Sequence, residues 1–187
     1  MKEPSKTLHK RRTIRLKDYD YSEVGAYYLT MCTHENKRLF GEIKNGEMQL
    51  NQYGKIVLLT WNDLTNHIEN IGLGEFVVMP NHVHGIVNIV EPKNVTYQES
   101  DENLSGLKIA KTHPTQTPVS EIVRQFKTFS AMRINRLRKM RGTAVWQRDY
   151  YERIIRTQKA YMKIAEYIHN NPFQWENDKF YEESCNY

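Results

Sequence analysis

The sequence predicts a single α+β domain in which helices pack against an antiparallel sheet. Two observations support this prediction: short segments rich in β-branched and aromatic residues, and longer segments whose apolar residues recur every three or four positions. A length of 187 residues suits one domain, and a hydrophobic content of 39% is enough for one core.

The first half of the chain begins with a strand and a hairpin. Residues 27–33 are rich in Tyr and Thr, which predicts a strand. Residues 40–50 predict a hairpin that turns at Asn45-Gly46, because both residues readily adopt positive φ. Residues 52–70 have the apolar spacing of an amphipathic helix, and residues 75–80 predict a further strand.

The second half adds strands and two helices. A strand is expected at 84–90, and the polar segment without periodicity at 91–118 predicts a flexible loop. A helix is expected from its cap at Ser120 to about residue 138. Residues 144–146 predict a short edge strand, and a last helix is expected at 158–169.

The domain is expected to cover residues 11–180. A basic arm at 1–10 precedes it, and a tail at 181–187 follows it. The two cysteines, Cys32 and Cys185, cannot build a disulfide framework, and the sequence has no apolar run typical of a signal sequence or a membrane span. These features predict a cytoplasmic protein with no membrane partner.

The net charge of +5 is unevenly distributed. Residues 121–159 contain eleven Lys or Arg and three acidic residues, so this stretch carries +8 and the rest of the chain carries −3. A local excess of positive charge attracts polyanions such as nucleic acids. A solvated helical surface can have the same composition, so the charge alone does not distinguish the two.

Two histidines two positions apart lie in the segment Pro80-Asn81-His82-Val83-His84-Gly85. Side chains alternate across a strand, so His82 and His84 are expected on one face and Val83 on the other. Two neutral imidazoles on a rigid strand form half of a divalent-metal site. Pairs with this spacing also occur on strands by chance, and the spacing leaves both interpretations open.

Tyr167 and Asn171 are four positions apart near the end of the last expected helix. If the helix continues through Asn171, both side chains lie on one face. A deprotonated tyrosine oxygen is a nucleophile, and an amide oxygen is a hard metal ligand. The chain has twelve tyrosines, and Tyr167 could equally belong to a half-buried helical stripe.

Taken together, these motifs resemble a known family. Met79-Pro80-Asn81-His82-Val83-His84-Gly85-Ile86 resembles the histidine–hydrophobic–histidine (HUH) motif of the single-tyrosine transposases. The stretch from Trp146 to Arg156, followed by Tyr167-Ile168-His169-Asn170-Asn171-Pro172, is similar to the REP-associated tyrosine transposase (RAYT) branch. The resemblance covers roughly residues 11–180 and is interrupted by the loop at 91–118.

The resemblance implies a ferredoxin-like antiparallel sheet with helices on one face and a C-terminal helix that carries the nucleophilic tyrosine. It implies that His82, His84 and Asn171 bind a divalent metal, Mg²⁺ or Mn²⁺, and that Tyr167 is catalytic. The implied function is nicking and rejoining of single-stranded DNA through a 5′-phosphotyrosine, with hairpin or repeat-end DNA as the partner. No nucleotide cofactor is expected, since transesterification conserves the phosphodiester energy and no P-loop pattern is present. Relatives include monomers and homodimers, and the sequence does not select between them.

In this context the basic stretch is interpreted as a DNA surface, with cations on phosphates and aromatic rings stacked on unpaired bases. The residues expected there are Lys127, Arg148, Arg153, Arg156, Trp146, Tyr150 and Tyr151. For Trp146, a core anchor is the alternative. Many relatives carry His at the position of Arg153, where a guanidinium could not act as a base but would bind phosphate well.

Two other functions are compatible with these motifs. One is a catalytically silent, single-stranded nucleic-acid-binding protein of the same fold, and the other is a metal-dependent phosphodiesterase that uses water as its nucleophile. The complete set of His82, His84, Tyr167 and Asn171 argues against the silent binding protein, which would not need all four.

Overall fold

A computed structural model describes residues 23–91 and 117–181 of the chain. The expected arm at 1–10 lies outside the described residues. The same holds for the expected loop at 91–118 apart from its ends, and for the expected tail beyond Tyr181.

Helices and strands follow one another along the chain as β1 (Gly25–Cys32), β2 (Gly41–Lys44), β3 (Glu47–Leu50), α1 (Gln52–Asn62), β4 (Ile71–Val78), β5 (His82–Ile89), α2 (Val119–Leu137), β6 (Tyr151–Ile155) and α3 (Gln158–Asn170). Single 3-10 turns lie at His34–Asn36, Asp63–Asn66 and Trp175–Asn177.

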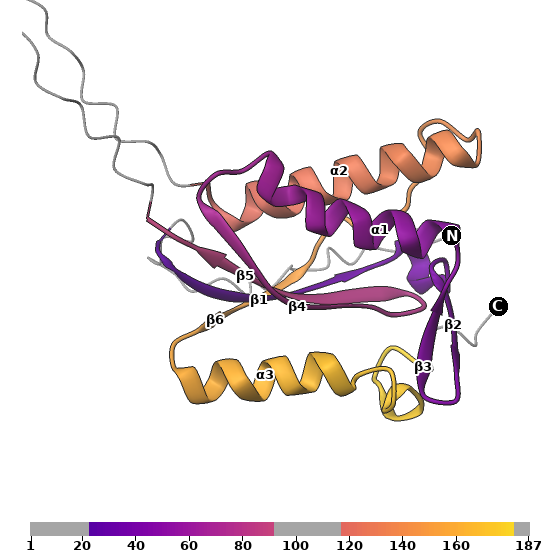
Figure 1. Cartoon of the computed structure of the whole chain (residues 1–187). Coiled ribbons are helices and arrows are strands. Elements are labelled where there is room, and N and C mark those ends of the chain that lie inside the picture. The colour runs from indigo at the N-terminus through magenta and orange to yellow at the C-terminus, as the bar shows by residue number, and fades with distance from the viewer. Residues whose placement is uncertain (1–22, 92–116, 182–187) are drawn as a thin grey trace, which may run out of the picture.

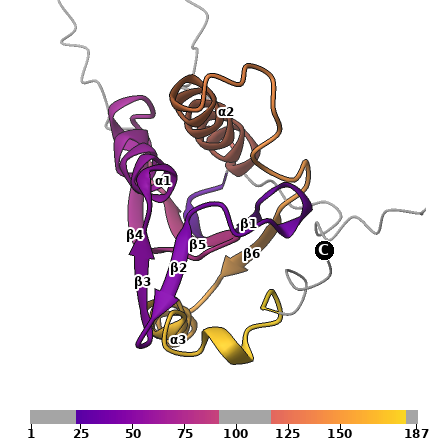
Figure 2. The ribbon, with the colours of Figure 1, turned by 90° about the vertical axis from the view of Figure 1, so that its right-hand side faces the viewer.

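Four strands form one antiparallel sheet in the order β4-β5-β1-β6, and β2 pairs with β3 in a separate hairpin. Without that hairpin, the chain order from β1 to β6 is strand-helix-strand-strand-helix-strand, which is the ferredoxin-like plan. α1 and α2 lie side by side on one face of the sheet, and α3 lies on the opposite face (Figures 1 and 2). The predicted fold class is therefore confirmed, with the C-terminal helix placed on a face of its own.

The two faces of the sheet bury different side chains. Along β1, Tyr27, Leu29 and Met31 are fully buried in the larger cluster, which is covered by α1 and α2. The side chains of the residues between them lie on the α3 face. The hydrophobic cluster on that face is smaller and centres on Ile86 and Ile168. The α3 face therefore has room for the polar groups described below.

Local sequence signals explain where several elements begin and turn. Asn45 and Gly46 form the hairpin turn with φ of 53° and 76°, the positive values that a tight two-residue turn requires. The side chain of Asn51 accepts hydrogen bonds from the backbone N–H groups of Tyr53 and Gly54 and so caps α1. The Thr157 hydroxyl caps α3 in the same way, by accepting from the N–H of Ala160 at 3.1 Å.

Two predicted helix boundaries were wrong. α1 ends at Asn62 instead of near residue 70, because a 3-10 turn follows at Asp63–Asn66. Leu64 is still buried, so the apolar spacing continues past the end of the helix. α2 begins after Pro118, and Ser120 lies inside it without serving as its cap.

The strand predictions also needed correction at the edge of the sheet. Residues 144–146 form no strand, and Trp146 makes only an isolated bridge to Thr33. The edge strand is β6 (Tyr151–Ile155), whose alternating polar and apolar residues were not recognised as a strand. None of the helices within residues 23–91 and 117–181 has the length and apolar character of a membrane span.

Candidate metal and tyrosine site

β5 begins with the two histidines of the candidate site. Met79 donates its backbone N–H to the carbonyl oxygen of His82 at 2.9 Å, which closes the turn between β4 and β5. Both imidazoles lie on the α3 face and are buried, and the side chain of Val83 lies on the opposite face, as the spacing predicted. Their Nε2 atoms are 3.1 Å apart.

The hydrogen bonds behind the rings define how the histidines are oriented. The Asn81 amide donates to the carbonyl oxygen of Phe180 at 2.9 Å, which turns its Oδ1 toward His82 Nδ1 at 2.8 Å. An amide oxygen only accepts, so His82 carries its proton on Nδ1 and its Nε2 has a free lone pair. His84 Nδ1 lies 2.8 Å from the Tyr28 hydroxyl and 2.9 Å from the Thr30 hydroxyl. Both rings therefore turn Nε2 into the site.

Burial keeps both imidazoles neutral. It lowers the pKa of His82 to about 3, helped by the nearby ammonium of Lys179, while a contact with Asn171 acts in the opposite direction. Burial also holds the pKa of His84 well below its ordinary value, and the proximity of His82 adds to this effect. Neutral imidazoles with free lone pairs are the form that binds metal ions.

α3 places Tyr167 and Asn171 over the histidines. The backbone of Asn171 is still helical, with φ −57° and ψ −41°, so the two side chains lie on one face of the helix. The Tyr167 hydroxyl lies 3.5 Å from His84 Nε2, and the side chain is 40% exposed. Burial of the phenol raises the pKa of Tyr167.

Asp178, which no sequence pattern predicts as a site residue, lies at the site because the chain folds back after the 3-10 turn at Trp175–Asn177. Ligand atoms of His82, His84 and Asp178 all lie within 4.8 Å of one another, so this group can hold a metal ion. Asp178 accepts hydrogen bonds from the Asn171 amide at 3.1 Å and from the Phe180 N–H at 2.8 Å. The residue lies in a polar stretch without periodicity, and no sequence signal marks it.

Asn171 supplies the observation that tests whether a metal ion fits. Its Oδ1 is buried and accepts no hydrogen bond from the part of the chain that the structure describes. An unsatisfied buried acceptor is costly unless something outside the protein satisfies it. Two imidazole nitrogens, an amide oxygen and a carboxylate form a mixed nitrogen–oxygen set that suits a divalent ion such as Mn²⁺. The donors fit the ion.

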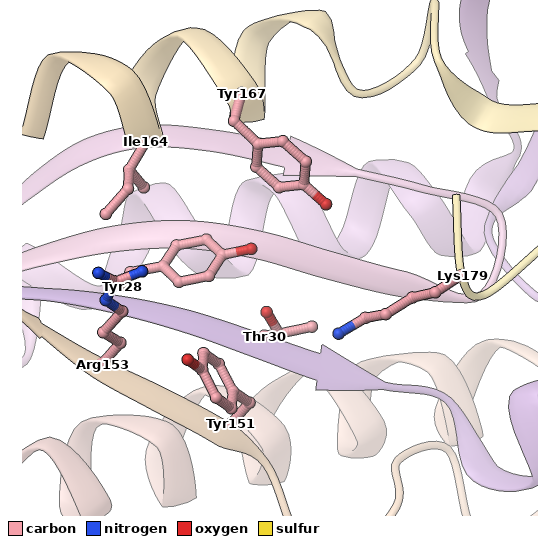
Figure 3. Close-up of a pocket in the computed structure, with 7 residues that line it drawn as sticks. All are labelled: Tyr28, Thr30, Tyr151, Arg153, Ile164, Tyr167 and Lys179. Atoms are coloured by element: carbon pink, nitrogen blue, oxygen red, sulfur yellow. The ribbon is translucent and has the colours of Figure 1, made fainter. Parts of the chain in front are cut away.

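Two residues of the predicted DNA surface lie beside this site. A pocket of about 300 Å³ opens next to Tyr167, with Tyr151 and Arg153 in its wall (Figure 3). Both come from β6, where they lie opposite Thr30 and Tyr28 of β1. Arg148 and Arg156 are exposed at either side of β6.

The structure places three other members of that predicted surface in the layer of α1 and α2. Trp146 is 8% exposed and donates to the Ser130 hydroxyl at 2.9 Å, so it is the core anchor given above as the alternative. The Lys127 ammonium donates at 2.9 Å to the backbone carbonyls of Gln147 and Asp149, so hydrogen bonds within the protein engage its charged group. The half-buried ring of Tyr150 lies 5.4 Å from the Lys127 ammonium, away from Tyr167. The core position of Trp146 argues against base stacking, whereas DNA contacts by Lys127 and Tyr150 stay predictions.

An uncharacterized protein of Haemophilus influenzae is 39% identical to this chain over 178 residues, which are 93% of this chain and 94% of the relative. The chain belongs to the family of that protein. No family model matches the sequence.

A solved structure has a fold similar to that of this chain. It is described as a REP-associated tyrosine transposase bound to a REP hairpin. It superposes on this chain with a TM-score of 0.54 at 17% identity, over 88% of this chain and 76% of the other. This chain therefore shares the fold of that structure.

Proposed function

We propose that this protein nicks and rejoins single-stranded DNA, with Tyr167 as the nucleophile and a divalent metal ion as the cofactor. The observation that carries the proposal is the convergence of a tyrosine hydroxyl with two neutral, buried imidazoles. The hydroxyl lies 3.5 Å from His84 Nε2, and the buried amide oxygen of Asn171 has no hydrogen-bond donor among residues 23–91 and 117–181. A divalent ion held between these side chains would satisfy that oxygen.

His82, His84, Asn171 and Asp178 would hold the ion. The bound ion would polarise the scissile phosphate and stabilise the charge that develops on it. The protein itself keeps both imidazoles neutral by burial. It also fixes their orientation through hydrogen bonds to their Nδ1 atoms, on the side of each ring away from the metal. Asn81 does this for His82, and the hydroxyls of Tyr28 and Thr30 do it for His84.

In the nicking step, Tyr167 Oη gives up its proton to solvent and forms a bond to phosphorus. The bond between phosphorus and the 3′ oxygen breaks, and that oxygen takes up a proton from solvent. The products are a 5′-phosphotyrosine and a free 3′-hydroxyl. Rejoining reverses these steps, and no nucleotide cofactor is needed because the phosphodiester energy is retained in the linkage to Tyr167.

DNA as the substrate is supported by two further observations. The protein whose structure shares this fold is bound to a REP hairpin. Residues 121–159 carry a net charge of +8, which favours a polyanion, and Arg148, Arg153 and Arg156 of that stretch are exposed. Hairpin DNA with an unpaired extension is therefore the first substrate to test.

The test is the formation of a covalent adduct. The full chain is incubated with hairpin DNA and Mn²⁺ and then denatured in SDS. A label at the 3′ end of the DNA should stay on the protein, and a label at the 5′ end should be released. Tyr167→Phe should abolish the adduct, and Tyr53→Phe, on α1 across the sheet, should keep it.

The other outcomes identify the other two functions. Cleavage without an adduct would indicate a phosphodiesterase that uses water. Binding with neither cleavage nor adduct would indicate a catalytically silent binding protein. Either result would overturn the proposal.

A further inference from the structure

The pocket beside Tyr167 has the size and lining of a subsite for one small ligand. Its volume of about 300 Å³ is at the lower end of the range for small-molecule pockets, so it has no room for a duplex. The strands β1 and β6 form one wall, and α3 and the segment after it form the other (Figure 3).

Two cationic side chains lie at opposite ends of the pocket. Arg153 projects from β6 at one end, and Lys179 reaches in from the segment after α3 at the other (Figure 3). Across residues 23–91 and 117–181, neither forms an ion pair with a carboxylate. Lys179 is close enough to the histidines to lower the pKa of His82, which places its charge at the metal end of the pocket. The Lys179 ammonium also lies 4.7 Å from the centre of the Phe180 ring, a contact that leaves its charge unneutralised. Two cations that lack a carboxylate partner among the described residues suit a ligand with two negative groups.

An aromatic ring lies between the two cations. Tyr151 packs with its ring at an edge-to-face angle to Tyr28, 6.2 Å away, and is 37% exposed, so the exposed part of the residue is available to a ligand. Ile164 of α3 adds an apolar group to the lining. A base that is paired in a duplex cannot enter such a space, whereas an unpaired base can stack on an aromatic ring.

We propose that this pocket binds one unpaired nucleotide of the DNA substrate, with its base against Tyr151 and its two flanking phosphates on Lys179 and Arg153. Lys179 contacts the scissile phosphate, next to Tyr167. Arg153 contacts the phosphate on the other side of the nucleotide. This inference rests on the proposed function and adds the part of the substrate that the site recognises. It also gives Arg153 a role that needs a permanent charge and no proton transfer.

The test measures binding in the Tyr167→Phe background, where no adduct can form, so its result does not depend on the chemistry. The probe is a fluorescent DNA hairpin with a short unpaired extension, selected from a pool with randomised extensions. Single abasic sites are then placed along the extension in the presence of Mn²⁺. One position should matter most, with a loss of affinity of about 5-fold to 100-fold, the range for one lost base stack.

Variants link that position to the pocket. Tyr151→Leu should weaken binding of the intact probe and remove the extra effect of the abasic site, and Tyr151→Phe should restore both. Arg153→Gln and Lys179→Gln should each make the slope of log affinity against log salt shallower, by the amount expected for the loss of about one phosphate contact. Arg141→Gln, an exposed arginine outside the pocket, is the matched control and should leave the abasic profile unchanged.

Three outcomes would overturn the inference. One is an abasic profile that is flat, and another is a profile that Tyr151→Leu leaves unchanged. The third is a salt dependence that falls equally in Arg153→Gln and Arg141→Gln. A sensitive position in the Tyr167→Phe protein, together with no adduct in the wild type, would support the subsite and contradict only the chemistry.

Discussion

His82 and His84 approach each other through their Nε2 atoms, which lie 3.1 Å apart on the α3 face of the sheet. Nitrogen ligands on one metal ion, at bonds of about 2.0–2.1 Å, are separated by about this distance. The pair is thus already spaced for a shared ion, and the hydrogen bonds on the Nδ1 side keep it so.

The first prediction is that His84→Ala lowers Mn²⁺ affinity by more than 10-fold, since one of two imidazole ligands is lost and second-shell changes alone cost 10–100-fold. Mn²⁺ binding can be followed by electron paramagnetic resonance or calorimetry. His67→Ala is the matched control, because His67 lies 3.4 Å from the Asp63 carboxylate on the other side of the sheet and is about half exposed. Equal effects of the two variants would contradict a metal site at β5.

Asp178 and Asn171 give the second prediction. Asp178→Asn keeps the shape of the side chain but removes the negative charge closest to the histidines, so Mn²⁺ affinity should fall by about 10-fold or more. Asn171→Ala should also weaken binding, because the orphan oxygen is lost. Asp149→Asn, an exposed control, should have no effect. Full Mn²⁺ affinity in Asp178→Asn would leave Asn171 as the third protein ligand.

The sequence predicted much of this site because its two motifs depend on local periodicity. The two-residue alternation of a strand fixes His82 and His84 on one face, and the four-residue spacing on a helix fixes Tyr167 and Asn171. The order of strands and helices was likewise sufficient for the α+β class. These inferences need only the conformation of one element at a time.

The parts that could not be predicted depend on how distant elements meet. Tyr28 reaches His84 through the pairing register of β1 with β5, which single-sequence periodicity does not fix. Asp178 arrives through an irregular segment that folds back after α3. The composition of a basic, aromatic stretch likewise does not show that Trp146 lies in the core or that Lys127 donates to backbone carbonyls.

The third prediction concerns acid stability without metal. Burial lowers the pKa of His82 to about 3 and also lowers that of His84, whereas in the unfolded chain both take up protons near pH 6.5. Between these values the unfolded chain binds more protons than the folded one, so stability rises with pH. The stabilisation is full above about pH 6.5 and is lost as the pH falls, at up to about 1.4 kcal/mol per pH unit for each histidine.

Urea unfolding in EDTA between about pH 7.5 and pH 5 measures this dependence. The wild type should lose stability toward pH 5 more steeply than His84→Asn, which has one buried imidazole fewer. Identical slopes in the two proteins would mean that burial does not lower the pKa of His84.

The fourth prediction assigns Lys127 a structural role. Its ammonium donates to the carbonyls of Gln147 and Asp149, and burial lowers its pKa to about 8, so it is largely charged at neutral pH. Lys127→Met should lower the free energy of unfolding by about 1.5–3 kcal/mol, the range for hydrogen bonds to a charged group. Its effect on DNA affinity at low temperature, where the variant is folded, should be small. A large loss of DNA affinity without a loss of stability would instead return Lys127 to the DNA surface.

The last prediction tests whether Tyr28 orients the metal ligand from behind. Its hydroxyl lies 2.8 Å from His84 Nδ1, and burial raises its pKa, so it stays protonated at neutral pH and can both donate and accept. Tyr28→Phe keeps the ring that stacks on His84 at 5.5 Å but removes the hydroxyl. Mn²⁺ affinity should fall by about 10-fold, because the imidazole loses one of the two hydrogen bonds that hold its Nδ1.

Thr30→Val should remove the other hydrogen bond, at 2.9 Å, and the double variant should lose more affinity than either single variant. Tyr27→Phe, whose hydroxyl donates to the carbonyl of Glu23 on the other face, is the matched control and should keep full affinity. If Tyr28→Phe also keeps full affinity, the orientation of His84 is set by the backbone of β5 and not by the hydroxyl behind it.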